Sequence, residues 1–542
     1  MALLASSAMV IMRQIINFQY RDETLKGHFM TDPTSSIDLN RRQFIEAASV
    51  GAMAAAGGLQ LTASEARAAP AAGLDICYMN ATELAARIQR KDLSAVEVMT
   101  AFLDRIDQVN PKVNAIVSMV DRDTAMSMAK QADADLQAGK TVGKLHGMPW
   151  AVKDMDDVNG FPTTLGSLIF KNNIAKADSL MAARLRAAGA LIIGKTNCPE
   201  FSAGSHTFNK VFGITRNPYN LALSAGGSTG GGAAAVASGM LPMADGNDTG
   251  GSLRNPGSWN NVVGFRTSIG RVPIEFPTAF YLRLPSYGPT ARTVQDSAYL
   301  LSVMAGPDPL DPISLPDDPA IFAKPLDRNF KGTPIAWTPD LGYLPVEKQV
   351  VEATAKSIPI LKSIGCMVEN DQPDMTGSFE THKTLRGALV AIATEKFFDT
   401  QRNLIKETMI WDAEGGRKLT AFDVGHAEAQ RTKIYHSLRK FLEKYEFLVL
   451  PVSQVVQFPV ETEYPAEING KKMTTYMEWM ESCYAISLTG LPAISVPCAF
   501  TESGLPVGLQ IVGRHNDDLG VLQLANAFEK AAAMGRPRVP KI

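Results

Sequence analysis

The sequence contains few cysteines and no cysteine motif. Its 542 residues include five cysteines, and no two of them have the CxxC spacing of a zinc site or a redox motif. We therefore expect neither a disulfide framework nor a zinc centre, and we expect the thiols to be free and buried. Because no other cluster of metal ligands is visible, the sequence predicts no metal and no other cofactor. The cysteines are Cys77, Cys198, Cys366, Cys483 and Cys498.

The sequence also lacks a strong excess of either charge. It has 53 Lys and Arg residues against 55 Asp and Glu residues, which gives a formal net charge of −2. This balance provides no electrostatic reason to expect nucleic acid or an anionic membrane as a partner. With 45% hydrophobic and 20% charged residues, the composition is typical of a soluble globular protein with a large core.

The apolar run at residues 47–63 is too short and too weak to predict a transmembrane helix, so we expect no stable membrane insertion. Two arginines, Arg41 and Arg42, precede it, and Ala66-Arg-Ala68 follows with small residues suited to cleavage. This is the layout of a twin-arginine export signal. We expect residues 1–69 to be a cleaved leader and the mature protein to be periplasmic or secreted. An ordinary amphipathic leader or a cytoplasmic tail is the alternative.

Helix and strand patterns alternate after the leader. Ser94-Ala-Val-Glu97 is a capping box that predicts a helix to about Val109. The alternation predicts an α/β fold, in which a mixed β-sheet is covered on both faces by α-helices. Since no linker is visible after residue 74, we expect residues 70–542 to form a single large domain. Further strands are expected at 113–119, 150–153, 190–195, 334–337 and 447–451, and helices at 121–138, 181–187, 233–239, 294–304, 347–364 and 378–409.

Two glycine-flanked serines lie close together in residues 224–271. Ser228 stands in Gly226-Gly-Ser-Thr-Gly230, and Ser252 stands in Asp248-Thr-Gly-Gly-Ser-Leu-Arg254. A serine becomes a strong nucleophile when a base takes its proton and nearby donors receive the developing negative charge. Flanking glycines allow backbone N–H groups to approach a substrate closely. One short segment can therefore supply two hydroxyls and a set of backbone donors to one place.

The stretch contains no histidine, so a base has to come from elsewhere, and Lys153 is the candidate. The apolar run 150–152 predicts a buried strand that ends at this lysine. Burial disfavours the ammonium form, and a pKa lowered by about 3 units, or ~4 kcal/mol, would let the amine act near neutral pH. Neutral Lys153 could then take a proton from one serine, which takes it from the other. A surface ion pair with Asp154 is the alternative.

These residues resemble the amidase signature hydrolases, a family that uses a Ser–Ser–Lys triad. The resemblance covers roughly residues 74–542 and includes later motifs at 288–294, 304–309, 490–497 and 504–513 in the expected order. It implies that Ser252 is the nucleophile, that Lys153 is the base, and that Ser228, held by a cis peptide, bridges them. It also implies an oxyanion hole made by the backbone N–H groups of residues 249–252, namely Thr249, Gly250, Gly251 and Ser252.

Neighbouring residues are expected to support this site. Gly227 precedes the bridging serine, and Asp248 and Arg254 flank the nucleophile, where an ion pair or hydrogen bonds could hold the loop. Two of the chain's motifs depart from the family pattern. Gly264-Phe-Arg-Thr-Ser268 stands where Gly-Leu-Lys-Pro-Thr is common, and Thr229 stands where a second serine is common. We expect neither departure to involve the triad.

Other interpretations of the serines are weaker. Ser228 also fits the G-x-S-x-G nucleophile elbow of α/β-hydrolases, which requires a preceding strand and a later Asp and His. Residues 216–220 have a loop-like sequence, which argues against an elbow. A glycine-rich turn in which Ser252 only caps a helix is the non-catalytic alternative. A phosphate-binding loop is rejected because no G-K-[ST] follows the glycines.

The histidines carry little signal. Four of them lie in no distinctive context, and two lie nearer the motifs, where we expect a pocket-wall or structural role. The first group is His382, His426, His436 and His515, and the second is His146 and His206.

The sequence as a whole predicts an amidohydrolase that cleaves a carboxylic amide through an acyl-enzyme, giving a carboxylate and ammonia or an amine. We expect a small-molecule substrate and a monomer or homodimer. Two alternatives stay open: an amidotransferase-type subunit that acts with partners in the cytoplasm, and a non-catalytic periplasmic binding protein of the same fold.

Residues 313–490 are expected to build much of the pocket. There Tyr476, Met477, Trp479 and Met480 either line an apolar acyl or aryl site or belong to the core.

Overall fold

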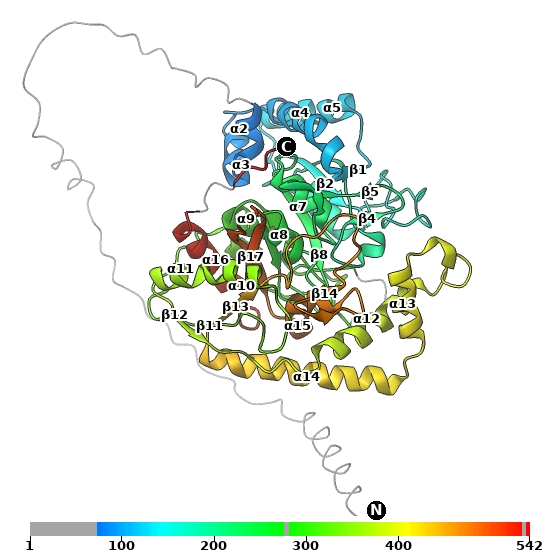
Figure 1. Ribbon diagram of the computed structural model, residues 1–542. Helices are drawn as coiled ribbons and strands as arrows, with labels where there is room; N and C mark the ends of the chain where they lie inside the picture. The colour runs from blue at the N-terminus through cyan, green and yellow to red at the C-terminus, as the bar shows by residue number, and fades with distance from the viewer. Residues whose placement is uncertain (1–72, 276–280, 534–537) are drawn as a thin grey trace, which may run out of the picture. The chain divides into compact units, whose positions relative to one another are not determined.

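The computed structural model of the chain describes residues 73–275, 281–533 and 538–542 (Figure 1). All of these residues belong to one compact unit, Pro70–Ile542. They form an α/β domain in which helices cover both faces of a central mixed sheet, as the sequence predicts. The predicted export leader lies outside the described residues, so its cleavage and the location of the protein stay predictions.

The central sheet has eight strands in the order β12-β11-β13-β17-β16-β9-β10-β8. β11 is parallel to β12 and β13, and the other neighbouring pairs are antiparallel. The edge strand β8 leads directly into the loop that carries Ser252. The strands are β8 (Met243–Asp248), β9 (Val263–Arg266), β10 (Ser286–Ala291), β11 (Pro334–Trp337), β12 (Met367–Asn370), β13 (Phe447–Pro451), β16 (Ala493–Phe500) and β17 (Pro506–Val512).

A separate sheet of three strands, in the order β1-β3-β2, carries Lys153. β2 (Pro149–Lys153) is buried along its whole length and ends at the lysine, as predicted. It is parallel to β3 (Leu191–Thr196), which pairs with the two-residue strand β1 (Ile116–Val117). β2 also packs against β8 of the large sheet. The sequence predicts one sheet, whereas the described residues form the eight-stranded sheet, this three-stranded sheet and three sheets of two strands each. The difference arises because alternation of strands and helices does not specify which strands pair.

Most helices begin and end close to their predicted positions. α4 (Ala95–Val113) starts at the predicted capping box, in which Ser94 and Glu97 each satisfy the backbone N–H of the other. α9 (Val294–Met304) has the predicted bounds. The remaining α-helices are α2 (Gly73–Tyr78), α3 (Ala81–Gln89), α5 (Arg122–Gln137), α6 (Leu180–Ala187), α7 (Gly230–Ala237), α8 (Arg254–Trp259), α10 (Lys348–Ala355), α11 (Ser357–Ser363), α12 (Ser378–Thr394), α13 (Glu407–Arg417), α14 (Ala421–Lys444), α15 (Glu481–Thr489) and α16 (Asp518–Ala531).

Two long predicted helices are interrupted. The helix expected at 347–364 is divided into α10 and α11, because Pro359 near the start of α11 cannot donate a hydrogen bond to the preceding turn. The helix expected at 378–409 ends at Thr394, and a separate helix, α13, begins at Glu407. The 24-residue helix α14, which ends just before β13, is not predicted from the sequence.

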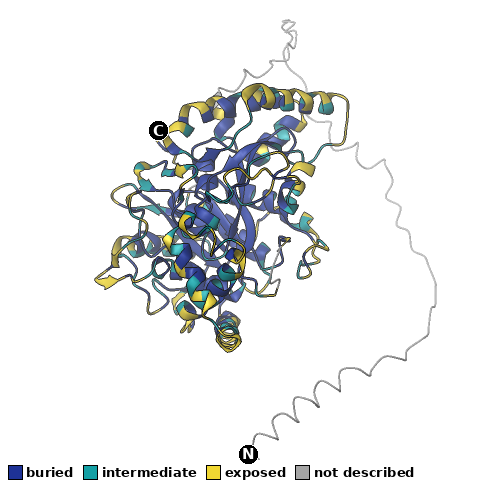
Figure 2. Ribbon diagram, turned by 90° about the vertical axis from the view of Figure 1, so that its right-hand side faces the viewer, coloured by how far each residue is buried: buried dark blue, intermediate teal, exposed yellow. Residues whose placement is uncertain are grey.

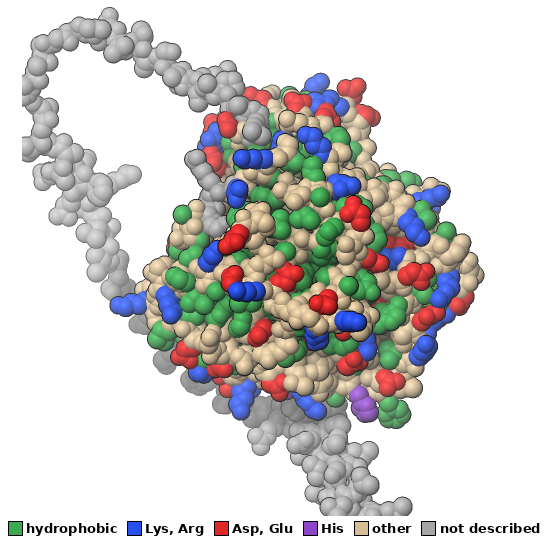
Figure 3. Space-filling view, in the orientation of Figure 1, with side chains coloured by type: hydrophobic (Ala, Val, Ile, Leu, Met, Phe, Trp, Pro, Cys, Tyr) green, Lys and Arg blue, Asp and Glu red, His purple; other side chains and the backbone are tan. Residues whose placement is uncertain are grey.

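The inner strands of the central sheet are buried, whereas its edge strand β12 and the outer faces of the surrounding helices are exposed to solvent (Figure 2). All five cysteines are free and buried, as predicted. Within the described ranges, no helix combines the length and the apolarity that crossing a bilayer requires. Basic and acidic side chains are interspersed over the face that Figure 3 shows, in agreement with the balanced composition.

Candidate active site

Lys153 lies at the centre of a buried polar cluster. Its side chain is 0% exposed, and its Nζ atom has three hydrogen-bond partners. The partners are Asn247 Oδ1 at 2.7 Å, Ser228 Oγ at 2.8 Å and Thr229 Oγ1 at 3.1 Å. The strand itself is tied to β8, since the Lys153 backbone N–H donates to the Asp245 carboxylate at 3.2 Å. The amine is therefore held in one position by groups from two segments.

Burial lowers the pKa of Lys153 to about 8, because removal from water disfavours the ammonium form. The buried thiol of Cys198 and the carboxylates of Asp156, Asp245 and Asp248 act in the opposite direction but do not cancel the effect. At pH 7 about a tenth of Lys153 is therefore the neutral amine that a general base requires, far more than for an unperturbed lysine.

Ser228 lies in the tight turn before α7. Its peptide bond to Gly227 is cis. A Cβ atom on Gly227 would lie 3.0 Å from the backbone nitrogen of His206, so this position has room for glycine and little else. The turn follows a short hairpin of β6 (Arg216–Asn217) and β7 (Asn220–Ser224), which corrects the expectation of a loop there.

The backbone of Ser252 is hydrogen-bonded to the turn that carries Ser228. Its carbonyl oxygen accepts a hydrogen bond at 3.0 Å from the N–H of Thr229, the residue after Ser228. The side chain is only partly buried, and its hydroxyl makes no hydrogen bond to another described residue. The structure thus joins Lys153 to Ser228 through side chains, and it brings Ser252 beside them through the main chain.

The loop from Thr249 to Ser252 presents several backbone donors. The N–H of Gly251 donates to Asp248 Oδ1 at 2.8 Å. The N–H groups of Thr249, Gly250 and Ser252 make no hydrogen bond within the described part of the chain. Gly251 has a φ of +113°, and an added Cβ would lie 2.7 Å from Cys483 Cβ, so this turn requires glycine. Of the four predicted oxyanion donors, three are therefore free to receive a substrate oxygen.

A buried ion pair holds this loop. Arg254 contacts the Asp248 carboxylate at 2.9 Å, and both side chains are 0% exposed. Arg266 donates to the Asp248 carbonyl oxygen and lies 3.7 Å from its carboxylate. Burial alone would raise the pKa of Asp248, but the two guanidinium groups outweigh it and hold that pKa well below its usual range. Arg254 also donates to the Cys483 carbonyl at 3.0 Å, which fixes α15 to the loop.

One of the two departures from the family pattern contacts the predicted triad, contrary to expectation, because Thr229 is a direct hydrogen-bond partner of Lys153. The other agrees with the expectation, since Arg266 is bound to Asp248, which lies outside the triad. Both departures are local changes in the sequence, whereas folding brings the side chains of Thr229 and Arg266 against Lys153 and Asp248.

The two histidines near the motifs have structural partners. His206 is bonded to the Val460 carbonyl at 2.9 Å and to Ser224 Oγ at 2.7 Å, and burial lowers its pKa to about 4. His146 is bonded to the Ala132 carbonyl at 3.0 Å. Since the partner of Ser228 is Lys153, the local contacts do not have the Ser–His pair of a nucleophile elbow.

The four residues expected to line an acyl or aryl site divide into two groups. Tyr476 and Met477 cluster with Tyr484, whose Cβ lies 3.4 Å from the position of a Cβ on Gly250. Trp479 instead stacks on Trp259, with 5.5 Å between ring centroids, and belongs to the core. Met480 is partly buried against both clusters.

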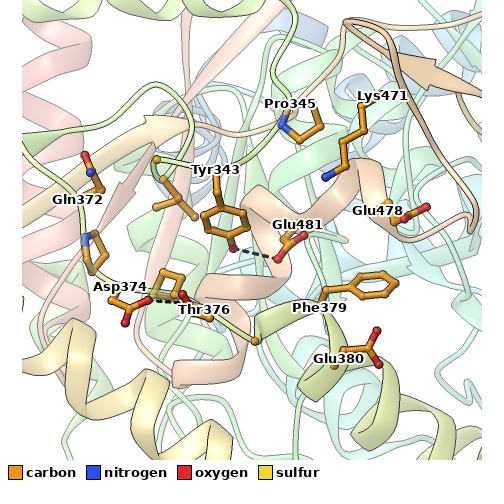
Figure 4. A pocket seen from close by; sticks show the side chains of 15 residues that line it. Tyr343, Pro345, Gln372, Asp374, Thr376, Phe379, Glu380, Lys471, Glu478 and Glu481 are labelled. Atoms are coloured by element: carbon orange, nitrogen blue, oxygen red, sulfur yellow. Dashed lines mark hydrogen bonds between the residues drawn. The ribbon is translucent and has the colours of Figure 1, made fainter.

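A cavity of about 680 Å³ opens near the first turns of α12 and α15 (Figure 4). Tyr343 points into it and donates to the Glu481 carboxylate at 2.9 Å, and Phe379 and Lys471 line other sides. Neither serine nor Lys153 lines this cavity. It therefore lies near the serine–lysine cluster, because α12 and α15 also border the loop from Thr249 to Ser252.

Comparison with known proteins decides the family. The sequence profile of the family described as Amidase matches residues 97–522. The chain belongs to the amidase signature family. Enzymes of this family hydrolyse amides.

Individual relatives point to more than one activity. The chain is 34% identical over 457 residues to an acylamidase of Rhodococcus erythropolis, covering 83% of this chain and 95% of that protein. It is also 34% identical over 475 residues to a glutamyl-tRNA(Gln) amidotransferase subunit of Geobacillus thermodenitrificans (strain NG80-2), covering 83% and 96%. Among solved structures, a bacterial aryl acylamidase of the amidase signature family superposes with a TM-score of 0.79 at 28% identity, covering 85% and 99%.

One residue of this amidase signature site is absent from the sequence-based prediction. Asn247 makes the shortest of the contacts to Lys153 Nζ. A signal for it exists in the sequence, because Asp245 and Asn247 stand two positions apart on β8 and therefore share a face. Both side chains of that face accept hydrogen bonds from Lys153.

Proposed function

We propose that the chain hydrolyses carboxylic amides through a Lys153–Ser228–Ser252 relay and an acyl-enzyme intermediate. The observation that carries the proposal is the buried Lys153 Nζ at 2.8 Å from Ser228 Oγ, beside the backbone of Ser252. A buried amine with a lowered pKa can accept a proton near neutral pH, whereas the amine of a surface lysine is already protonated there.

The contacts of the amine favour one arrangement of protons. A neutral amine has two N–H groups and one lone pair, and Asn247 Oδ1 can only accept a hydrogen bond. With the N–H groups donated to Asn247 and Thr229, the lone pair is left to accept the proton of Ser228. Asn247 and Thr229 thus orient the base, and their side chains support the proposed relay.

The reaction then runs in two balanced halves. Ser252 gives its proton to Ser228 as Ser228 gives its own to Lys153, and Ser252 Oγ bonds to the carbonyl carbon of the amide. The carbonyl oxygen takes the electron pair and is bound by backbone N–H groups of the 249–252 loop, each donor being worth about 3 kcal/mol. The proton returns through Ser228 to the leaving nitrogen, and the C–N bond breaks. Water attacks the acyl-enzyme by the same relay and releases the carboxylic acid.

Similarity to an acylamidase and to an aryl acylamidase makes N-acyl amines and anilides the first substrates to test. The experiment is a panel of amides and anilides given to the purified chain alone, with release of ammonia or amine as the readout. Turnover without any partner supports the proposal. No cofactor is required, and we propose a monomer or homodimer exported to the periplasm.

An amidotransferase-type role is the second candidate, because the identity to the glutamyl-tRNA(Gln) amidotransferase chain is the same 34%. A subunit of that kind would release ammonia from simple amides only when its partners are added. A chain that binds amides without turning them over under either condition would instead be a non-catalytic binding protein. Repeating the panel with the partner subunits added, and measuring amide binding, therefore separates the three functions.

A further inference from the structure

His382 lies beside the nucleophile loop, although the sequence places it in no distinctive context. It stands on α12, its ring is 2% exposed, and it stacks on Tyr484 of α15 with 4.4 Å between centroids and 15° between planes. α12 and α15 pack against each other in the region where Figure 1 shows both. The Nε2 atom of His382 lies 3.4 Å from the position of a Cβ on Gly250. The imidazole edge therefore faces the backbone of the proposed oxyanion loop.

Both ring nitrogens of His382 lack a hydrogen-bond partner among the described residues. A buried donor or acceptor that stays unpaired costs free energy, so such groups in folded proteins usually have a partner. His146 and His206, the other histidines near the motifs, each bond to a backbone carbonyl. The partner of His382 is therefore to be sought outside the chain.

The position of the ring relative to the loop is fixed. Arg254 joins the loop to α15 through the Cys483 carbonyl at 3.0 Å and Ser487 Oγ at 2.6 Å. Tyr484, the residue after Cys483, carries the ring on which His382 stacks. A shift of the imidazole away from Gly250 would therefore break its stacking on a ring whose helix is itself bound to the loop.

The imidazole is neutral at physiological pH. Burial lowers the pKa of His382 well below its usual value, and the nearby charges of Arg386, Arg266 and Arg431 lower it further. A neutral imidazole has one N–H donor and one acceptor nitrogen. It can bond a hydroxyl, an amide or a carbonyl, but it cannot form an ion pair.

We propose that His382 is a specificity-determining residue that hydrogen-bonds a neutral polar group of the substrate close to the scissile amide. This inference rests on the proposed amide hydrolysis and names its preferred substrate class. The preferred amides carry a hydroxyl, carbonyl or second amide a few bonds from the reacting carbon. A substrate with only hydrocarbon at that point leaves the imidazole unpaired, and such a loss discriminates strongly between otherwise similar substrates.

The test compares substrates matched in shape. One arm uses anilides of hydroxyacetic and propionic acid, which differ at the acyl group. The other uses amides of one acid with ethanolamine and propylamine, which differ at the leaving group. We expect the wild type to favour the hydroxyl member of one pair by at least about tenfold in kcat/KM, and the arm that responds shows which side of the amide His382 contacts.

His382→Phe keeps an aromatic ring for stacking and removes both nitrogens. It should reduce the preference in the responding pair to within about threefold, whereas His515→Phe, at an exposed histidine, should keep the wild-type preference. If His382→Phe does not fold, His382→Gln retains a donor and an acceptor and should keep part of the preference. Equal rates for both members of both pairs, or a preference unchanged in either His382 variant, would overturn the inference and assign the imidazole to solvent. Absence of any amide turnover would instead overturn the proposed function.

Discussion

Lys153 and Ser228 stand 75 positions apart in the chain, and their side chains meet at 2.8 Å in a place that water does not reach. They meet because β2 ends at Lys153 and packs against α7, the helix that begins just after Ser228, and against β8, which leads into the Ser252 loop. The amine is thereby kept neutral enough to act as a base. This arrangement has consequences for pH dependence, for stability and for which serine is acylated.

The activity should depend on pH through Lys153. Its pKa is lowered from 10.5 to about 8, so the ammonium form dominates below pH 8 and cannot accept a proton. We expect kcat/KM to rise about tenfold per pH unit below 8 and to level off above it. A profile measured from pH 6 to 10 with one amide checks this. Activity that stays constant across this range, or falls as pH passes 8, would contradict a lysine base.

Asn247 should control where that inflection lies. In Asn247→Asp a carboxylate would stand near the position of the Oδ1 atom that contacts Lys153 Nζ at 2.7 Å, and it would stabilise the ammonium form. We expect the inflection to move upward by about 1–3 pH units. Asn247→Leu is the matched control: it removes the acceptor without adding charge, so activity should fall without an upward shift. The same inflection in both variants would show that Asn247 does not act through the base.

The Asp248 ion pair should contribute more to stability than a surface pair. Asp248→Asn leaves two buried guanidinium groups, on Arg254 and Arg266, without their counter-charge, which should cost about 3–5 kcal/mol in the free energy of unfolding. Asp399→Asn, which removes the carboxylate of an exposed pair with Arg417, should leave the free energy of unfolding nearly unchanged, because solvent screens that pair. Urea unfolding of the two variants measures the difference. Similar losses in both would argue against the stabilising role of the buried pair.

The leader should be cleaved near Ala69. N-terminal sequencing of the protein recovered from the periplasm tests this, with replacement of Arg41 and Arg42 by lysine as the variant that should block export. A mature N-terminus upstream of Arg41 would contradict the prediction. Unchanged export of the twin-lysine variant would also contradict it.

The sequence predicts the parts of the site that lie on local motifs. The strand that ends at Lys153 and the glycine turns around Ser228 and Ser252 have short-range signatures, and the structure has a buried strand and two glycine-containing turns at these positions. The α/β class is confirmed for the same reason, since helix and strand periodicities are local.

Contacts between distant segments are not predicted. The division into two sheets, the contact of Thr229 with the base and the position of His382 all depend on which segments pack together. No sequence pattern near α12 distinguishes His382 from the other histidines. What distinguishes it is that its ring nitrogens have no partner among the described residues, and only the structure can show this. Asn247 is an intermediate case: side chains alternate between the two faces along β8, so the sequence indicates that Asn247 shares a face with Asp245.

The central claim is that Ser252 carries the acyl group and that Ser228 only transfers protons. Incubation with an activated anilide, rapid acid quenching and peptide mapping by mass spectrometry locate the acyl group directly. We predict an adduct on Ser252 in the wild type, none in Ser252→Ala, and a slow appearance on Ser252 in Ser228→Ala and Lys153→Ala. An adduct on Ser228, or turnover by Ser252→Ala, would contradict the account.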